Sequence, residues 1–200
     1  MWEPYKKGFR AWLQLEKSLS DNSVEAYLSD VEKLTQYLNQ KKINGSPSDL
    51  KLKDLQQFVK WIAGLGITAS SQARIISGIK SFYKYCLTEK ISDQDPTALL
   101  EAPKVKRSRH DVLSFSEIET MINKIDQSKP EGLRNKAILE IMYSCGLRVS
   151  EVVNLKMSHL YLDVGFVRVI GKGDKERLIP IGREAVKFTK LYRDKSRSQY

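Results

Sequence analysis

The feature that most constrains the fold is the helical spacing of apolar residues through the first hundred positions. Between Val24 and Leu38, apolar residues recur every three or four positions, behind a run of polar residues that can cap a first helical turn. A later segment with the same period stops at Gly64 and Gly66, as helices with a glycine C-cap do. Such spacing predicts a small all-helical domain over residues 1–102, with helices expected within 4–17, 19–38, 52–66 and 70–90.

Residues 103–110 interrupt this pattern and predict a linker. Pro96 and Pro103 end the preceding helical region, and the run KVKRSR at 104–109 contains four cations without apolar periodicity. Such a run is either a solvated linker or a segment that lies against phosphates, through Lys104, Lys106, Arg107 and Arg109.

The second part of the chain, residues 111–200, mixes helical and strand patterns. A helix is expected after Ser114 or Ser116, where Glu117 and Glu119 suit the positive end of a helix. Another helix is expected to stop at Gly146. Residues 165–182 change to β-branched runs around a Gly- and Asp-rich turn, which predicts a hairpin, and a last helix begins near Arg183. The expected fold class is therefore mainly α with a small β-sheet or hairpin.

Composition narrows the class of partner and the compartment. The formal net charge of +10 favours a polyanionic partner, although it does not identify one. Cys86 and Cys145 each lie in an apolar helical pattern, which favours two reduced core thiols over a disulfide or a zinc site. The N-terminus carries charges where a signal peptide needs an apolar run, and no stretch approaches the ~18 apolar residues of a membrane span. We therefore expect a cytoplasmic protein with no membrane association.

The polar side of the 70–90 helix is a candidate phosphate-binding face. Cations alternate there with small hydroxyls, and no acidic residue occurs between Ser70 and Leu87. A helix with such a face can approach a sugar-phosphate backbone closely while its cations reach phosphates on either side, although a plain solvent-exposed face is the alternative. The candidate residues are Arg74, Ser77, Lys80, Ser81 and Lys84.

Two further cations stand in unusual positions. Arg148 lies between apolar runs in GLRVSEVVNL, where a charge is costly unless it is paired or used, so it is either a structural ion-pair member or part of a reactive site. Lys172 lies between two glycines at the tip of the expected hairpin. The surrounding sequence lacks the GxxxxGK and following Ser or Thr of a nucleotide-binding loop. Lys172 is instead placed to reach a groove or an active site built elsewhere.

The stretch GLRVSEVVNLKMSHLYLDVGFVRVIGKGDKERLIPIG at 146–182 resembles the first half of the catalytic domain of the tyrosine recombinase family, which includes the phage integrases and Xer-type enzymes. The preceding helical region is similar to that family's four-helix, SAM-like core-binding domain. The resemblance implies a core-binding domain followed by the first half of an α+β catalytic domain, which close round duplex DNA from opposite sides. It also implies recombinase protomers as partners, as tetramers in the full-length family, and no metal or other cofactor.

The resemblance implies roles for individual residues. A tyrosine hydroxyl attacks a backbone phosphate in this family, giving a 3′-phosphotyrosyl link while the 5′ hydroxyl leaves. Arg148 would stabilise the charge on the phosphate oxygens, and Lys172 would donate a proton to the leaving oxygen. Glu151 would orient Arg148, or would serve only as a favourable charge in a first helical turn. Lys175 and Arg177 of the Lys-Glu-Arg run are assigned to DNA binding.

The sequence departs from the family pattern in its second half. The family continues with His-x-x-Arg, a further His or Trp, and the nucleophilic Tyr, whereas His110 and His159 are here followed three positions later by Leu113 and Leu162. Tyr192 and Tyr200 lack the preceding motif. We therefore expect a truncated site-specific recombinase that binds DNA without cleaving it. The alternatives are a short, non-catalytic DNA-binding regulator of a mobile element and an unrelated helical adaptor that binds acidic proteins.

Overall fold

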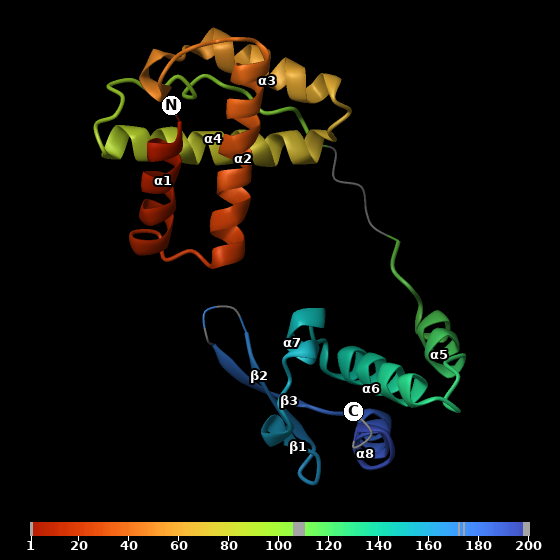
Figure 1. Ribbon diagram of the computed structural model, residues 1–200. Coiled ribbons are helices and arrows are strands. Elements are labelled where there is room, and N and C mark those ends of the chain that lie inside the picture. Colours follow the sequence, from red (N-terminus) through yellow and green to blue (C-terminus); the bar gives the residue numbers. More distant parts are fainter. Residues whose placement is uncertain (1, 106–110, 172, 174, 198–200) are drawn as a thin grey trace. The chain divides into compact units, whose positions relative to one another are not determined.

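The structure is a computed structural model that describes residues 2–105, 111–171, 173 and 175–197. Contacts divide the chain into two compact units, Met1–Arg109 and His110–Tyr200. It is mainly helical with one small antiparallel sheet (Figure 1), which confirms the expected fold class. No helix within the described ranges is both long and apolar enough to cross a membrane.

The first unit is built from helices whose apolar stripes face one another. In Figure 1 α2 crosses α4, against which it packs, and α1 also contacts both helices. Phe9, Leu34, Phe58 and Phe82 are fully buried, one from each α-helix, so all four helices share one core. The elements are α1 (Glu3–Leu15), α2 (Asp21–Gln40), the 3-10 helix η1 (Pro47–Asp49), α3 (Leu52–Gly64) and α4 (Ala69–Thr88).

The second unit places helices on one face of its sheet. Val167 and Val169, alternate residues of the central strand, are buried with residues of α6, α7 and α8. The strand order is β1-β2-β3, with both pairings antiparallel. The elements are α5 (Phe115–Asn123), α6 (Pro130–Cys145), α7 (Val149–Val153), the 3-10 helix η2 (Met157–His159), β1 (Leu160–Tyr161), β2 (Phe166–Ile170), β3 (Glu176–Pro180) and α8 (Arg183–Lys195).

Several expected boundaries are confirmed by local geometry. Ser114 caps α5, because its hydroxyl accepts from the backbone N–H of Glu117 while the Glu117 carboxylate accepts from the Ser114 backbone N–H. Gly146 ends α6 with φ of 60°, a left-handed conformation that favours glycine. Cys86 and Cys145 are both buried free thiols. The hairpin forms as β2 and β3, and α7 supplies the helical turn that one interpretation of Glu151 required, while β1 was not expected.

Candidate functional site

The end of α6 determines where Arg148 lies. After the left-handed turn at Gly146, the side chain of Leu147 is buried in the core of the second unit. Arg148 follows in an extended conformation as the N-cap of α7, and its side chain is 77% exposed. The buried leucine thus anchors the backbone next to the arginine, while the guanidinium itself remains open to solvent.

Glu151 lies one turn further and receives hydrogen bonds from two arginines. Its Oε1 accepts from Arg148 Nη1 at 3.1 Å and from Arg177 Nη1 at 3.0 Å. Its Oε2 accepts from the backbone N–H of Arg148 at 2.9 Å and from Arg177 Nη2 at 2.9 Å. The Glu151 side chain is only 6% exposed, so this carboxylate is a buried, fully bonded centre that links α7 to β3.

The charge state of Glu151 follows from these bonds. Hydrogen bonds from Arg177, and then from the Arg148 backbone N–H, lower the pKa of Glu151 to about 2 although its partial burial acts in the opposite direction. The carboxylate therefore stays ionised at neutral pH. The orienting role expected for Glu151 agrees with its hydrogen bond to Arg148, and the favourable position in the first turn of α7 holds as well.

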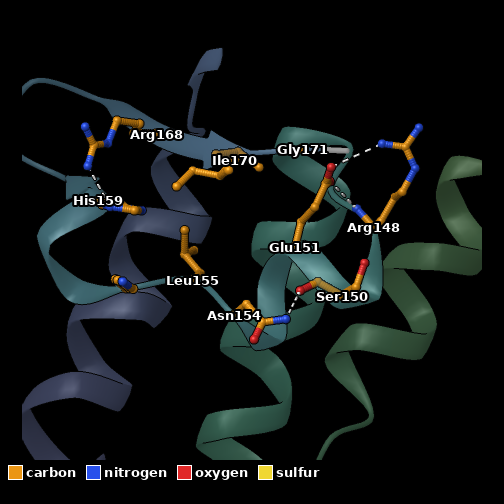
Figure 2. A pocket seen from close by; sticks show the side chains of 11 residues that line it. Arg148, Ser150, Glu151, Asn154, Leu155, His159, Arg168, Ile170 and Gly171 are labelled. Carbon is orange, nitrogen blue, oxygen red and sulfur yellow. Dashed lines mark hydrogen bonds and ion pairs between the residues drawn. The ribbon is translucent and has the colours of Figure 1, made fainter. Parts of the chain in front are cut away.

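A pocket of about 640 Å³ adjoins this cluster (Figure 2). Arg148 and Arg168 lie on opposite sides of it, and the side chain of Glu151 lies beside Gly171. Cationic and polar side chains, together with apolar ones, therefore line a space large enough for a phosphate group. The lining residues are Arg148, Ser150, Glu151, Asn154, Leu155, Lys156, His159, Arg168, Val169, Ile170 and Gly171.

Sequence reasoning missed the pair of His159 and Arg168 in this lining. Arg168 Nη2 lies 2.7 Å from His159 Nε2, and the imidazole is buried. Because a guanidinium can only donate, the imidazole Nε2 is the acceptor in this contact. Arg168 lies on the face of β2 opposite buried Val167 and Val169, where a polar side chain is normal, so the strand pattern carried no signal for this pair.

The hairpin residues fall into different environments. Lys172, the expected proton donor, lies outside the described residues. Lys175 is exposed, as a direct DNA contact requires. Arg177 was expected to bind DNA; in the structure both of its terminal nitrogens donate to Glu151. The cause is the strand register, which pairs Arg177 with buried Val169 and so turns its side chain toward α7.

One of the cations on the polar face of α4 is paired with an acidic residue, which the sequence did not lead us to expect. Lys80, Lys84 and Ser77 are exposed and Ser81 is half-buried. Arg74, however, forms an ion pair with the fully buried Asp30 of α2. The expectation of uncompensated cations along this face is therefore wrong for Arg74, because the compensating acid comes from another helix 44 positions earlier in the sequence.

The Asp30 carboxylate is an unusual buried group. Its Oδ1 accepts from Arg74 Nη2, whereas its Oδ2 has no hydrogen-bond partner among the described residues. Burial raises the pKa of Asp30 to about 6, against the attraction of Arg74.

In the expected linker, Lys104 is exposed, whereas Lys106, Arg107 and Arg109 lie outside the described residues.

Comparisons with known proteins match both units. Residues 7–90 match the family model described as phage integrase, N-terminal SAM-like domain, and residues 111–199 match the model described as phage integrase family. Tyrosine recombinase XerD of Listeria innocua serovar 6a is 37% identical over 189 residues, which covers 94% of this chain and 64% of the relative. Tyrosine recombinase XerD of Proteus mirabilis is 40% identical over 178 residues, which covers 89% of this chain and 56% of the relative. The chain thus spans less than two thirds of the length of these relatives.

A solved structure shows the same fold. The Tn1549 transposon integrase in complex with a circular intermediate DNA superposes with a TM-score of 0.70 at 14% identity, covering 96% of this chain and 65% of that one. The two family models together match most of the chain, one in each unit. The first relative above, a tyrosine recombinase, matches nearly the whole length of the chain. This chain belongs to the phage integrase family of tyrosine recombinases.

Proposed function

We propose that this chain binds duplex DNA at a recombination site as part of a site-specific DNA recombinase, and that Arg148 contacts the phosphate at which strands are exchanged. The observation that carries the proposal is the Arg148 guanidinium, which is 77% exposed beside the pocket and bonded to the buried carboxylate of Glu151. Among the described residues, that guanidinium donates one hydrogen bond, to Glu151. Its remaining donors suit the non-bridging oxygens of a phosphodiester.

The proposed reaction exchanges one phosphoester bond for another. A tyrosine hydroxyl attacks the phosphorus, the bond to the 5′ oxygen breaks, and a 3′-phosphotyrosyl ester holds the strand until a second 5′ hydroxyl reverses the step. Arg148 stabilises the negative charge that builds on the non-bridging oxygens. Lys172 donates a proton to the leaving 5′ oxygen. Each bond broken is replaced by one of the same kind, so no energy source is required.

The affinity for DNA comes mainly from phosphate contacts outside this pocket. The exposed cations of α4, Lys80 and Lys84, are separated by one helical turn and accompanied by the hydroxyls of Ser77 and Ser81. The run at 104–109 and Lys175 of the hairpin add further cations. The proposed contacts thus come from both units. Other protomers of the same recombinase, assembled as a tetramer on the DNA, are the proposed protein partners.

We propose further that these 200 residues bind DNA without forming a covalent link. Neither histidine in them is followed three positions later by arginine, so the second phosphate-binding arginine of the family pattern is missing from this sequence. Tyr192 is half-buried on α8, a helix that packs against α6, and it is not among the residues that line the pocket. Among the described residues, no tyrosine lines this pocket, so a phosphate held at Arg148 has no tyrosine nucleophile from its lining.

The binding test is fluorescence anisotropy with a labelled duplex at ~50 to ~200 mM salt. Several neutralised phosphates give an affinity that falls by about 10³-fold across this range. Arg148→Ala should weaken binding about tenfold, whereas Lys60→Ala, which removes one exposed cation from α3, should change it less than about twofold. An affinity independent of salt, or equal effects of the two variants, would contradict the proposal and favour the adaptor alternative.

The cleavage test uses a duplex with a nick beside the cleavage position. The nick lets the cleaved fragment diffuse away, so any phosphotyrosyl adduct accumulates and appears as a shifted band in denaturing electrophoresis. No band is expected from these 200 residues. A band that disappears in Tyr192→Phe would show that the chain cleaves DNA by itself and would refute the non-cleaving part of the proposal.

A further inference from the structure

We propose that Arg177 is a positioning residue: it holds Glu151 so that the guanidinium of Arg148 remains available to a phosphate. This inference rests on the function proposed above and extends it to a residue outside the pocket lining. It also replaces the interpretation of Arg177 as a direct DNA contact.

The first support is the way in which the hydrogen-bonding capacity of Glu151 is divided. A carboxylate has about four acceptor positions, two on each oxygen. Arg177 occupies one on each oxygen, at 3.0 and 2.9 Å. The Arg148 backbone N–H takes a third, which leaves a single position for the Arg148 guanidinium, at 3.1 Å. Glu151 therefore orients Arg148 through one bond and cannot engage it through two parallel bonds.

The consequence for Arg148 follows from competition between anions. A carboxylate free of Arg177 can form a bidentate pair with a guanidinium, which is the geometry that a phosphate also requires. Glu151 released from Arg177 would then compete with DNA for Arg148. With Arg177 in place, the positive charge of Arg177 compensates the negative charge of Glu151. Arg148 then keeps hydrogen-bond donors for a phosphate.

The second support is the space made for this ion pair. A Cβ atom on Gly171 would lie 3.0 Å from Arg177 Nη1 and 3.8 Å from Glu151 Oε1. A glycine at this position therefore lets the arginine side chain pass close to the end of β2. The register places Arg177 opposite Val169, two positions before Gly171, so the strand pairing brings the guanidinium to this site.

A double-mutant cycle with Arg148→Ala and Arg177→Gln tests the proposal by DNA affinity. Arg177→Gln should weaken binding about five- to tenfold in the native background and less than about twofold in the Arg148→Ala background. A direct contact of Arg177 with a phosphate would instead weaken binding by the same factor in both backgrounds, and would overturn the proposal. Arg183→Gln, which removes an exposed arginine at the start of α8, is the matched control and should change neither affinity by more than about twofold.

A second measurement follows Glu151 without DNA. Titration of its side-chain carboxyl carbon by NMR should show that Arg177→Gln moves the pKa of Glu151 from about 2 toward its ordinary value of 4.5, whereas Arg183→Gln leaves it unchanged. A pKa that stays near 2 in Arg177→Gln would overturn the proposal. If Arg177→Gln does not fold, Arg177→Lys keeps the charge but not the paired donors, and the same cycle and titration apply to it.

The two measurements separate this inference from the proposed function. If Arg148→Ala leaves DNA affinity unchanged, the proposed function fails, even where the pKa of Glu151 rises in Arg177→Gln. If Arg148→Ala weakens binding but the cycle shows additive effects, the function holds and the positioning role of Arg177 is refuted. Support for both requires a weakened Arg148→Ala, a non-additive cycle and a raised Glu151 pKa.

Discussion

The two units each contain a buried carboxylate paired with arginine, and the two pairs behave in opposite ways. Asp30 has one oxygen bonded to Arg74 and one without a partner in the described structure, and its pKa rises to about 6. Glu151 has both oxygens bonded to two arginines and a backbone N–H, and its pKa falls to about 2. Burial governs the first carboxylate and hydrogen bonding governs the second.

This difference separates a packing contact in the first unit from the cluster beside the proposed phosphate site in the second. The pair of Asp30 and Arg74 joins α2 to α4, where Gly78 leaves no room for a Cβ atom beside the carboxylate. Its strength depends on pH because the acid can take a proton. The Glu151 cluster keeps its charge at any pH above about 4 and leaves Arg148 exposed. An ion pair between an arginine and a carboxylate therefore does not by itself indicate a phosphate-binding site. A buried carboxylate whose acceptor positions are all occupied, next to an exposed arginine, is stronger evidence for such a site.

The largest effect on stability is expected for Arg74→Ala. It leaves the Asp30 carboxylate buried without its partner, at an expected cost of about 1–3 kcal/mol in the free energy of unfolding at pH 8. At pH 5, below the pKa of about 6, Asp30 is already protonated, so the cost should be smaller. Urea unfolding at the two pH values measures both costs. Equal costs would show that Asp30 does not titrate in this range.

Gly78→Ala should be nearly as damaging. The added methyl group would collide with the side chain of Asp30 and force α2 and α4 apart, at about 1–2 kcal/mol after the better helix propensity of alanine is counted. Gly64→Ala is the matched control, because nothing lies within 4 Å of its Cβ position at the end of α3. Thermal unfolding should show a lower midpoint for Gly78→Ala and an unchanged or higher one for Gly64→Ala.

Asp30→Asn and Glu151→Gln should change the pH dependence of stability in opposite ranges. The pKa of Asp30 is raised above its ordinary value of 3.8. Asp30 therefore contributes fully to the free energy of unfolding below pH 3.8, and this contribution is lost as the pH rises through about 6. The pKa of Glu151 is lowered, so its contribution is complete above 4.5 and is lost as the pH falls toward about 2. When the free energy of unfolding is plotted against pH from 2 to 8, the plot should therefore become flatter above pH 4 in Asp30→Asn and below pH 4.5 in Glu151→Gln. Flattening in the same range for both variants would refute the contrast.

The smallest effect on stability is expected for Arg148→Ala. The side chain is largely exposed, and Glu151 keeps both bonds from Arg177 in this variant. The free energy of unfolding should change by less than about 0.5 kcal/mol, as for other surface substitutions. A loss of several kcal/mol, measured by urea unfolding, would make Arg148 a structural ion-pair member and refute its assignment to the phosphate.

Much of the fold could be predicted because it is recorded in local patterns. The long helices have apolar stripes, and their ends carry the residues that their geometry requires, such as Ser114 and Gly146. The elements β1 and α7 have two and five residues, too few to show a period. They form because the neighbouring strand and the N-cap at Arg148 supply their hydrogen bonds.

The candidate site could be predicted only in part. Arg148 and Glu151 are three positions apart on one helical turn, so their contact is local. Arg177 reaches Glu151 across 26 positions, and its strand has an inverted pattern, with Leu178 exposed and Arg177 turned toward the core. The pairing of Arg74 with Asp30 also joins two separate helices. Charges that meet through tertiary packing leave no periodic trace in the sequence.

The register between β2 and β3 has an evolutionary consequence. Pairing of Val169 with Arg177 fixes the guanidinium in the strand and not in the turn that joins the strands. A slip of one residue would turn Arg177 outward and Leu178 inward, and the partner of Glu151 would be lost. Insertions or replacements within the turn can therefore accumulate during evolution without changing the geometry around Arg148, provided that the strand pairing, Gly171 and the proposed proton donor Lys172 are kept.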